Sequence, residues 1–214
     1  MKAESTAYFV DLWTRKAPIA EMLTGRKTTA SERVAALHGL SVKAGTNTYD
    51  LPADRAGALT LPAFLAASSH VSSEHPEPSM VMRGLFVLRK VLCMDVPAPP
   101  NNVNAAPIVP KAGQTQRTAA EERKRNDVCA ACHGTIDSLA YALEPYDAMG
   151  RFRGKDEFGN TLRSDGALVD PVVAESKPYG NARELFDLLA ALPEVESCAV
   201  RHTMQFALGR PVHE

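Results

Sequence analysis

A five-residue stretch, Cys129-Ala130-Ala131-Cys132-His133, constrains this chain more than any other feature of its sequence. Two thiols separated by two residues, with an imidazole directly after the second, suit the addition of both sulfurs to the vinyl groups of one haem. The imidazole of His133 would then reach the iron as its proximal ligand. The motif therefore predicts one covalent haem c, held by Cys129, Cys132 and His133.

Three other interpretations of the motif compete with haem. A redox-active C-x-x-C is expected beside alternating strands and helices, and the sequence shows no such alternation. A zinc site needs two further ligands, but no second C-x-x-C and no H-x₃₋₅-H pair follows the motif. The third interpretation is chance, in which these residues share a buried helix without any cofactor. Covalent haem is favoured because the motif contains every group that attachment requires.

Length, composition and charge exclude several other classes of protein. The 214 residues suffice for one large domain or two small ones, and 45% of them are apolar. With a net charge of −1, the chain resembles neither a disordered polymer nor a nucleic-acid-binding protein. No apolar run approaches the length of about 18 residues that a membrane span requires. A redox partner protein, recognised through local charges, is the expected partner, and the oligomeric state stays open.

The expected compartment is periplasmic or extracellular, because bacteria attach haem to C-x-x-C-H outside the cytoplasm. The N-terminal stretch MKAESTAYFVDLWTRKAP has no continuous apolar region and no small-residue cleavage site, so it does not read as a secretory signal. The simplest reconciliation is that this chain is a mature form or a fragment of a longer secreted protein.

Two cysteines remain outside the motif, Cys93 and Cys198. Both are expected on apolar faces of helices, and no third cysteine competes for either of them. An oxidising compartment would join such a pair, so a Cys93–Cys198 disulfide is predicted. The alternative is a pair of buried free thiols, which are common in protein cores.

The hydrophobic pattern predicts a mainly α fold. Thr29 and Thr118 each begin a capping-box sequence, and Asn181 is a further expected N-cap. His38 is expected on the surface, and Arg83, Arg89 and Lys90 are expected to form the polar edge of an otherwise buried helix. Helices are expected over residues 5–24, 29–39, 58–67, 80–93, 118–144, 181–192 and 193–208, with one short hairpin within 161–169. Pro18 is expected to interrupt the first of these helices or to begin a new one.

A proline-rich run, VPAPPNNVNAAPIVP, divides the predicted helices into two groups. It contains five prolines and cannot form a helix, so it is expected to be an extended connector. The predicted organisation is a helical domain over residues 1–95, a connector over 96–117 and a cytochrome c-like helical haem domain over 118–214.

The chain resembles the planctomycete-type secreted cytochrome c family, in which the C-terminal portions are domains of unknown function. The resemblance rests on the motif Cys129–His133, the proline-rich run, Leu61–Ala66, Arg83–Leu88 with Leu92-Cys93, Ala142-Leu143-Glu144, Tyr146-Asp147, Gly150–Arg153, Cys198 and Ala207–Arg210. It implies a haem-bearing piece of a larger redox protein. The chain departs from the family at Ile136-Asp137-Ser138, where Met-Asp-Pro or Ile-Asp-Pro is common, and at Ser79-Met80, where Ser-Pro is usual.

The second iron ligand and the groups that hold the propionates are less constrained. Met149 is the first candidate for the sixth ligand, since it follows the haem helix in a turn that could fold back over the iron. The other candidates are Met80, Met82 and Met204, or one of His70, His75 and His202. Arg151 and Arg153 could hold the propionates by charge-assisted hydrogen bonds, and the alternative is a solvated turn.

Three functions are compatible with these features. The first is electron transfer by a haem c module of a larger redox protein. The second is a haem enzyme, peroxidase- or oxygenase-like, with an open sixth position. The third is a structural or binding domain that haem stabilises. Electron transfer is favoured because the sequence shows no acid–base constellation, so no catalytic residue is assigned.

Overall fold

The protein is described by a computed structural model over residues 1–42, 47–72, 77–96, 109–169 and 175–212. The helices in these ranges are α1 (Lys2–Thr14), α2 (Glu21–Thr24), α3 (Glu32–Leu37), α4 (Pro62–Ala67), α5 (Met80–Phe86), α6 (Gln116–Arg123), α7 (Asp127–Ser138), α8 (Ala182–Ala190) and α9 (Pro193–Leu208). The strands are β1 (Lys27–Thr29), β2 (Thr48–Asp50), β3 (Gly166–Val169) and β4 (Ser176–Tyr179). Short 3₁₀ turns cover Ala58–Thr60 and Tyr141–Leu143, and a π-helical turn over Val87–Val91 continues α5.

The four strands correct the predicted fold class. β1 pairs with β2 and β3 with β4, each pair antiparallel, so the described fold is mixed α/β rather than mainly α. The described residues also do not show the expected cytochrome c fold. Strands of three or four residues are too short for a period of two to appear in the sequence, which is why hydrophobic periodicity missed β1, β2 and β4.

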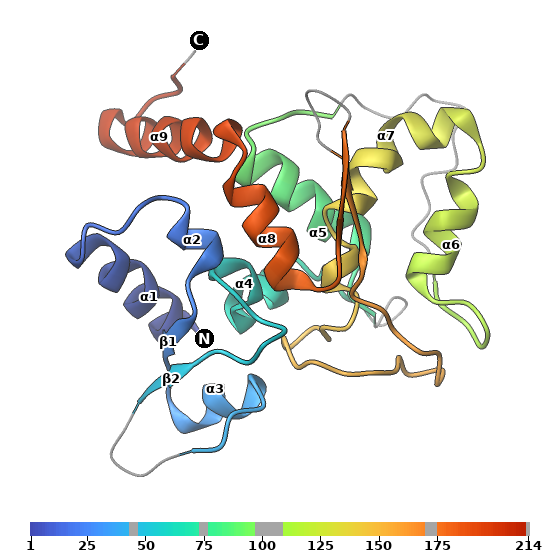
Figure 1. The fold of residues 1–214 in the computed structure, drawn as a ribbon, viewed down its shortest axis with the longest axis horizontal. Coiled ribbons are helices and arrows are strands. Elements are labelled where there is room, and N and C mark those ends of the chain that lie inside the picture. Colours follow the sequence, from blue (N-terminus) through green and yellow to red (C-terminus); the bar gives the residue numbers. More distant parts are fainter. Residues whose placement is uncertain (43–46, 73–76, 97–108, 170–174, 213–214) are drawn as a thin grey trace.

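Figure 1 shows α1, α2, α3 and the β1–β2 sheet on one side of the molecule, and α6 with the first turns of α7 on the opposite side. The helices α5 and α8 and the β3–β4 sheet lie between these two groups. The central region contains the largest hydrophobic core, which includes Leu88 after α5, Leu139 after α7 and Leu185 on α8. This core contains residues from both sides of the proline-rich run.

The proline-rich run itself lies mostly outside the described residues, so its expected extended conformation is not described. The division into 1–95, 96–117 and 118–214 stays a prediction. A disulfide does connect the two sides of the run: Cys93, after the π-helical turn, is bonded to Cys198 on α9 across 105 residues of sequence. The predicted Cys93–Cys198 pairing is therefore confirmed.

Three expected elements differ in their boundaries. The segment expected over 5–24 is two helices, and the interruption expected at Pro18 is confirmed, although the first helix already ends at Thr14, before Lys16 with its positive φ of 54°. Thr29 is a residue of β1 rather than a helix cap, and α3 begins after Ser31. A hairpin was expected within 161–169. In the structure, β3 lies in that range but pairs with the more distant β4, so that Gly166 lies opposite Tyr179.

The helix expected over 118–144 is also divided, into α6 and α7. Thr115, not Thr118, caps α6 by accepting a hydrogen bond from the amide of Thr118 at 3.1 Å. Asn126 caps α7 by accepting from the amides of Val128 at 3.0 Å and Cys129 at 3.4 Å. An N-capping asparagine in mid-sequence therefore starts a new helix two residues before the first cysteine of the motif.

The last two helices agree with the prediction. The side chain of Asn181 accepts a hydrogen bond from the amide of Glu184 at 3.0 Å, at the start of α8. Pro193 occupies the first turn of α9, and Gly209 ends it in the left-handed conformation with a φ of 61°. No helix in the described ranges is both long enough and apolar enough to span a membrane.

Arg83 is buried within α5 and not, as expected, on a polar edge. Its guanidinium donates to the carbonyls of Leu143 at 2.8 Å and Tyr146 at 2.7 Å. It also donates to the hydroxyl of Ser69 at 3.0 Å. Because backbone carbonyls and a hydroxyl accept from both of its terminal nitrogens, this arginine can be buried, and it joins α5 to the segment that follows α7.

Candidate functional site

The motif lies in the first two turns of α7. Cys129 and Cys132 are free thiols, and both are half-buried. Cys132 packs against the main core, while the neighbouring Val128 is 59% exposed. Figure 1 shows this end of α7 beside α6, at the edge of the molecule. The two thiols are therefore accessible from outside, on a helix whose inner side contacts the core.

The other end of α7 is anchored firmly in the protein. Ile136, Asp137 and Ser138 are buried. A Cβ on Gly84 of α5 would lie 2.1 Å from the carbonyl oxygen of Ile136, so the two helices touch at this glycine. The hydroxyl of Tyr179 on β4 donates to the carbonyl of Ser138 at 2.7 Å. These contacts fix the position from which the motif projects.

His133 has two polar neighbours at Nδ1. Its Nδ1 lies 3.0 Å from Oδ1 of Asp137, one turn further along α7, and 2.9 Å from an amino nitrogen of Arg123. The same arginine lies 3.5 Å from Oδ2 of Asp137. The carboxylate of Asp137 is fully buried, whereas the side chain of His133 is 21% exposed. One ring nitrogen of His133 thus contacts both members of an ion pair whose carboxylate is buried.

Three buried polar atoms, on Asp137 or on residues that interact with it, have no hydrogen-bond partner in the described structure. They are Oδ2 of Asp137, Nε of Arg123 and the hydroxyl of Tyr141. Burial, followed by the charge of Asp137, raises the pKa of Tyr141. The guanidinium of Arg117 and the ammonium of Lys124 both lie over the ring of Tyr141. Charges of both signs are therefore concentrated behind His133, on the side that faces α6.

The donor set of α7 fits a covalently attached haem. Two unpaired thiols and one imidazole stand at the spacing that attachment requires, and the other two cysteines are already joined to each other. Space exists beside the motif, because a Cβ on Gly134 would meet no atom within 4 Å. A zinc site fits less well: in the described ranges, the group of three possible metal ligands is Cys93, Cys198 and His202, which lies at the disulfide.

The two arginines expected at the propionates already have carboxylate partners in the structure. Arg153 forms a bidentate ion pair with Glu77, in which NH1 lies 2.8 Å from Oε1. Arg151 lies 3.7 Å from the carboxylate of Asp147 and is largely exposed. The structure does not bring these arginines into contact with His133, and their role as propionate ligands stays a prediction.

The expected sixth ligands are scattered over the molecule. Met149 is 44% exposed and its amide donates to Oδ1 of Asp147 at 2.8 Å. The next residue, Gly150, packs against Pro62 of α4. The turn that contains Met149 therefore lies against α4, beyond the buried end of α7. Met80 is buried in the main core, Met82 is half-buried and His70 is exposed. His75 lies outside the described residues, and the sixth ligand stays a prediction.

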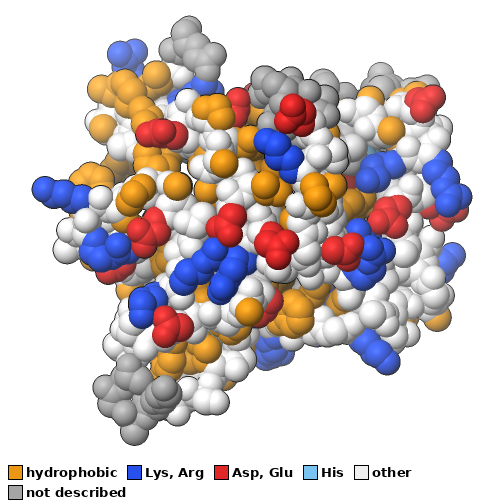
Figure 2. All heavy atoms as spheres, viewed as in Figure 1, with side chains coloured by type: hydrophobic (Ala, Val, Ile, Leu, Met, Phe, Trp, Pro, Cys, Tyr) orange, Lys and Arg blue, Asp and Glu red, His pale blue; other side chains and the backbone are white. Residues whose placement is uncertain are grey.

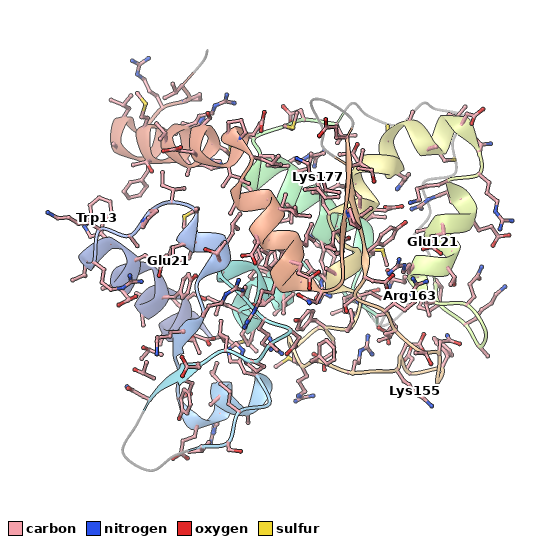
Figure 3. All side chains as sticks on the ribbon, viewed as in Figure 1. Trp13, Glu21, Glu121, Lys155, Arg163 and Lys177 are labelled. Carbon is pink, nitrogen blue, oxygen red and sulfur yellow. A yellow bond between two sulfur atoms is a disulfide. The ribbon has the colours of Figure 1, made fainter. Side chains whose placement is uncertain are left out.

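His202 and Met204 line an apolar groove between α1, α2 and α9, with a volume of about 920 Å³. Trp13, on the opposite wall at the end of α1, is 83% exposed (Figure 3). Figure 2 shows hydrophobic side chains gathered on the surface over α9. Nε2 of His202 lies 3.2 Å from the carbonyl of Lys90 and donates its hydrogen bond to it. This groove is separate from the thiols of α7.

Sequence reasoning missed Asp137 and Arg123 as the polar neighbours of His133. Asp137 could have been found, because residues four apart on a helix face each other and the sequence shows His133 followed by Asp137 at that spacing. Arg123 could not have been found in this way, because α6 and α7 were expected to be one continuous helix. Only the break at Asn126 turns Arg123 back toward the histidine.

Comparison with known proteins matches part of the chain to a family model. Residues 55–156 match the model of a family described as PSCyt3, a protein of unknown function (DUF1588), which is the planctomycete-type cytochrome c family domain. The match covers slightly less than half of the chain and includes α4, α5, α6 and α7. No curated protein and no solved structure matches the chain.

Proposed function

We propose that this chain is a c-type cytochrome module that carries one haem and transfers electrons, as part of a larger redox protein. One observation carries the proposal: α7 presents two free thiols and one imidazole at its accessible end, while the remaining cysteines are paired with each other. The name of the matching family, which covers the residues of the motif, supports the same assignment at a coarser level.

Each residue of the site has a distinct task in this function. The thiols of Cys129 and Cys132 would anchor the haem through thioethers, and Nε2 of His133 would bind the iron. The bound haem would supply a one-electron couple. Asp137 and Arg123 hold the imidazole from its other nitrogen, and the packing of Gly84 against Ile136 holds the helix.

The compartment follows from the same residues. A disulfide between Cys93 and Cys198 persists in the periplasm or outside the cell, where c-type haem is attached, and would be reduced in the bacterial cytoplasm. A redox partner protein is then the expected partner. We therefore include in the proposal that the protein acts in the periplasm or outside the cell and exchanges electrons with a partner protein.

The electron-transfer assignment is tested by spectroscopy of the purified protein. We would express the chain with an export signal and a c-type maturation system and record its absorption spectrum in the oxidised and reduced states. A carrier should be reduced and reoxidised reversibly by one electron, and carbon monoxide should leave the reduced spectrum unchanged. Rapid binding of carbon monoxide would instead indicate an open sixth position and favour a haem enzyme.

A variant pair connects that signal to the motif. Cys129→Ala with Cys132→Ala should remove the covalent haem spectrum. Cys93→Ala with Cys198→Ala removes the same number of sulfurs and should keep it. Equal loss of the signal in both double variants would contradict the assignment of the thioethers to α7.

A further inference from the structure

The hydrogen bonding of His133 decides which of its nitrogens can bind a metal. A neutral imidazole carries one proton, so Nε2 offers a lone pair to iron only when the proton resides on Nδ1. Oδ1 of Asp137, 3.0 Å from Nδ1, can accept that proton's hydrogen bond. Arg123, 2.9 Å from the same nitrogen, can only donate, and so favours the opposite tautomer with the proton on Nε2.

The two neighbours of Nδ1 therefore compete, and Asp137 has the advantage. With the proton on Nδ1, the histidine donates to Asp137, and the guanidinium of Arg123, 2.9 Å from that nitrogen, must turn its N–H groups toward the carboxylate, whose Oδ2 lies 3.5 Å away. With the proton on Nε2, the lone pair of Nδ1 would face a carboxylate oxygen at 3.0 Å, and two acceptors repel each other. Asp137 thus selects the tautomer that can bind iron.

The position of Asp137 makes this selection rigid. Its carboxylate is fully buried, and it lies next to Ile136, whose carbonyl touches Gly84 of α5. Within the described structure its oxygens meet His133 and Arg123 and no other side-chain cation. A ligating histidine that donates to a carboxylate becomes a stronger electron donor to its metal, which stabilises the oxidised state.

We propose that Asp137 is the positioning residue of this haem site, and that its charge, moderated by Arg123, holds the reduction potential below the value that a neutral partner of His133 would give. This inference rests on the proposed function, because it assigns a role toward the haem that the motif is proposed to hold. It adds the residues that set the potential of the haem, which the C-x-x-C-H motif does not identify.

The test is the midpoint potential of the haem protein and three variants. Asp137→Asn keeps an acceptor oxygen but removes the charge, and should raise the equilibrium constant for reduction about tenfold, or about 59 mV for one electron. Arg123→Gln leaves the carboxylate unopposed and should move the potential in the opposite direction. Asp127→Asn, an exposed acid in the first turn of the same helix, is the matched control for charge alone and should change the potential much less.

The outcomes separate this inference from the proposed function. A wild-type protein without covalent haem would contradict the proposed function itself. A wild-type protein with haem in which Asp137→Asn moves the potential no further than Asp127→Asn would overturn only the role of Asp137. If Asp137→Asn fails to fold, Arg123→Gln decides, and an unchanged or raised potential in that variant would overturn the inference.

Discussion

Gly84 on α5 lies against the backbone of Ile136 on α7, so closely that a Cβ at position 84 would come within 2.1 Å of the carbonyl oxygen. The carbonyl belongs to the backbone of a helix and cannot move aside like the end of a flexible side chain. This contact sets the distance between the helix that carries the thiols and the helix that supports it.

The first prediction concerns this contact. Gly84→Ala should destabilise the protein by several kcal/mol, because α7 must shift to accommodate the methyl group. Gly134→Ala on α7 is the matched control, since its Cβ would meet no atom within 4 Å, and it should be neutral or stabilising by about 0.5–1 kcal/mol. Denaturant unfolding of the haem-free protein measures both free energies, since Gly134 adjoins the space proposed for the haem. Equal stability of the two variants would show that the helices do not touch at Gly84.

The second prediction concerns the disulfide. Cys93→Ala with Cys198→Ala should lower the free energy of unfolding by up to about 4–5 kcal/mol, because the bond closes a loop of 105 residues. Thiol titration of the unfolded wild-type protein without reductant offers a direct count. Haem-free protein should show two thiols, those of Cys129 and Cys132, and haem-bearing protein should show none. Four thiols in the haem-free protein would contradict the disulfide.

The third prediction concerns the ion pair between Glu77 and Arg153. Glu77→Gln leaves a half-buried guanidinium without its anionic partner, and should cost about 1–3 kcal/mol of stability. Arg151→Gln is the control, because Arg151 is exposed and its carboxylate partner lies 3.7 Å away, and it should change stability by less than about 0.5 kcal/mol. A larger effect for Arg151→Gln would reverse this assignment of structural roles.

The fourth prediction concerns pH. Burial raises the pKa of the Glu144 carboxyl, against the hydrogen bonds it accepts from the amides of Arg163 and Arg117 (Arg163 is labelled in Figure 3). Between its ordinary and its raised pKa, the folded protein holds a proton that the unfolded chain has released. The stability contributed by this group is therefore full below the ordinary pKa and is lost as the pH rises through the raised pKa.

Glu144→Gln carries no such penalty, because glutamine does not ionise. The free energy of unfolding of Glu144→Gln minus that of the wild type should therefore be more positive at pH 7 than at pH 4. Denaturant unfolding of both proteins at both pH values measures this difference, and the other carboxylates cancel in it. A difference that stays constant or falls between pH 4 and pH 7 would contradict the raised pKa.

The parts of the fold that could be predicted from the sequence depend on local signals. Asn181 and Pro193 mark the starts of α8 and α9, and Gly209 marks the end of α9, because caps act within one turn of the chain. The spacing of the motif likewise names Cys129, Cys132 and His133 without reference to any other residue. The pairing of Cys93 with Cys198 followed from counting the cysteines that remain.

The parts that could not be predicted depend on partners distant in sequence. His38 was expected on the surface, but it is buried and its Nε2 lies 2.6 Å from the carboxylate of Glu4, 34 residues away. Arg83 is buried because carbonyls beyond α7 accept its hydrogen bonds. Local periodicity cannot reveal such contacts, since a polar side chain that is buried with partners is the same residue type as one that is solvated.

The candidate site shows the same division. The imidazole and the two thiols of the motif are evident in the sequence, whereas Arg123 reaches His133 only because the chain turns at Asn126 between α6 and α7. Met149 was placed first as the sixth ligand from its position after the haem helix. The structure places its turn against α4 through Gly150, a contact that no spacing in the sequence indicates.

The measurement that tests the central claim most directly is the intact mass of the protein, exported through a c-type maturation system and denatured in acid. Thioethers survive acid, whereas haem held only by its iron is released. We predict a mass increased by one haem, with the haem recovered on the peptide that contains Cys129 and Cys132. A denatured protein with the mass of the bare polypeptide would contradict the account.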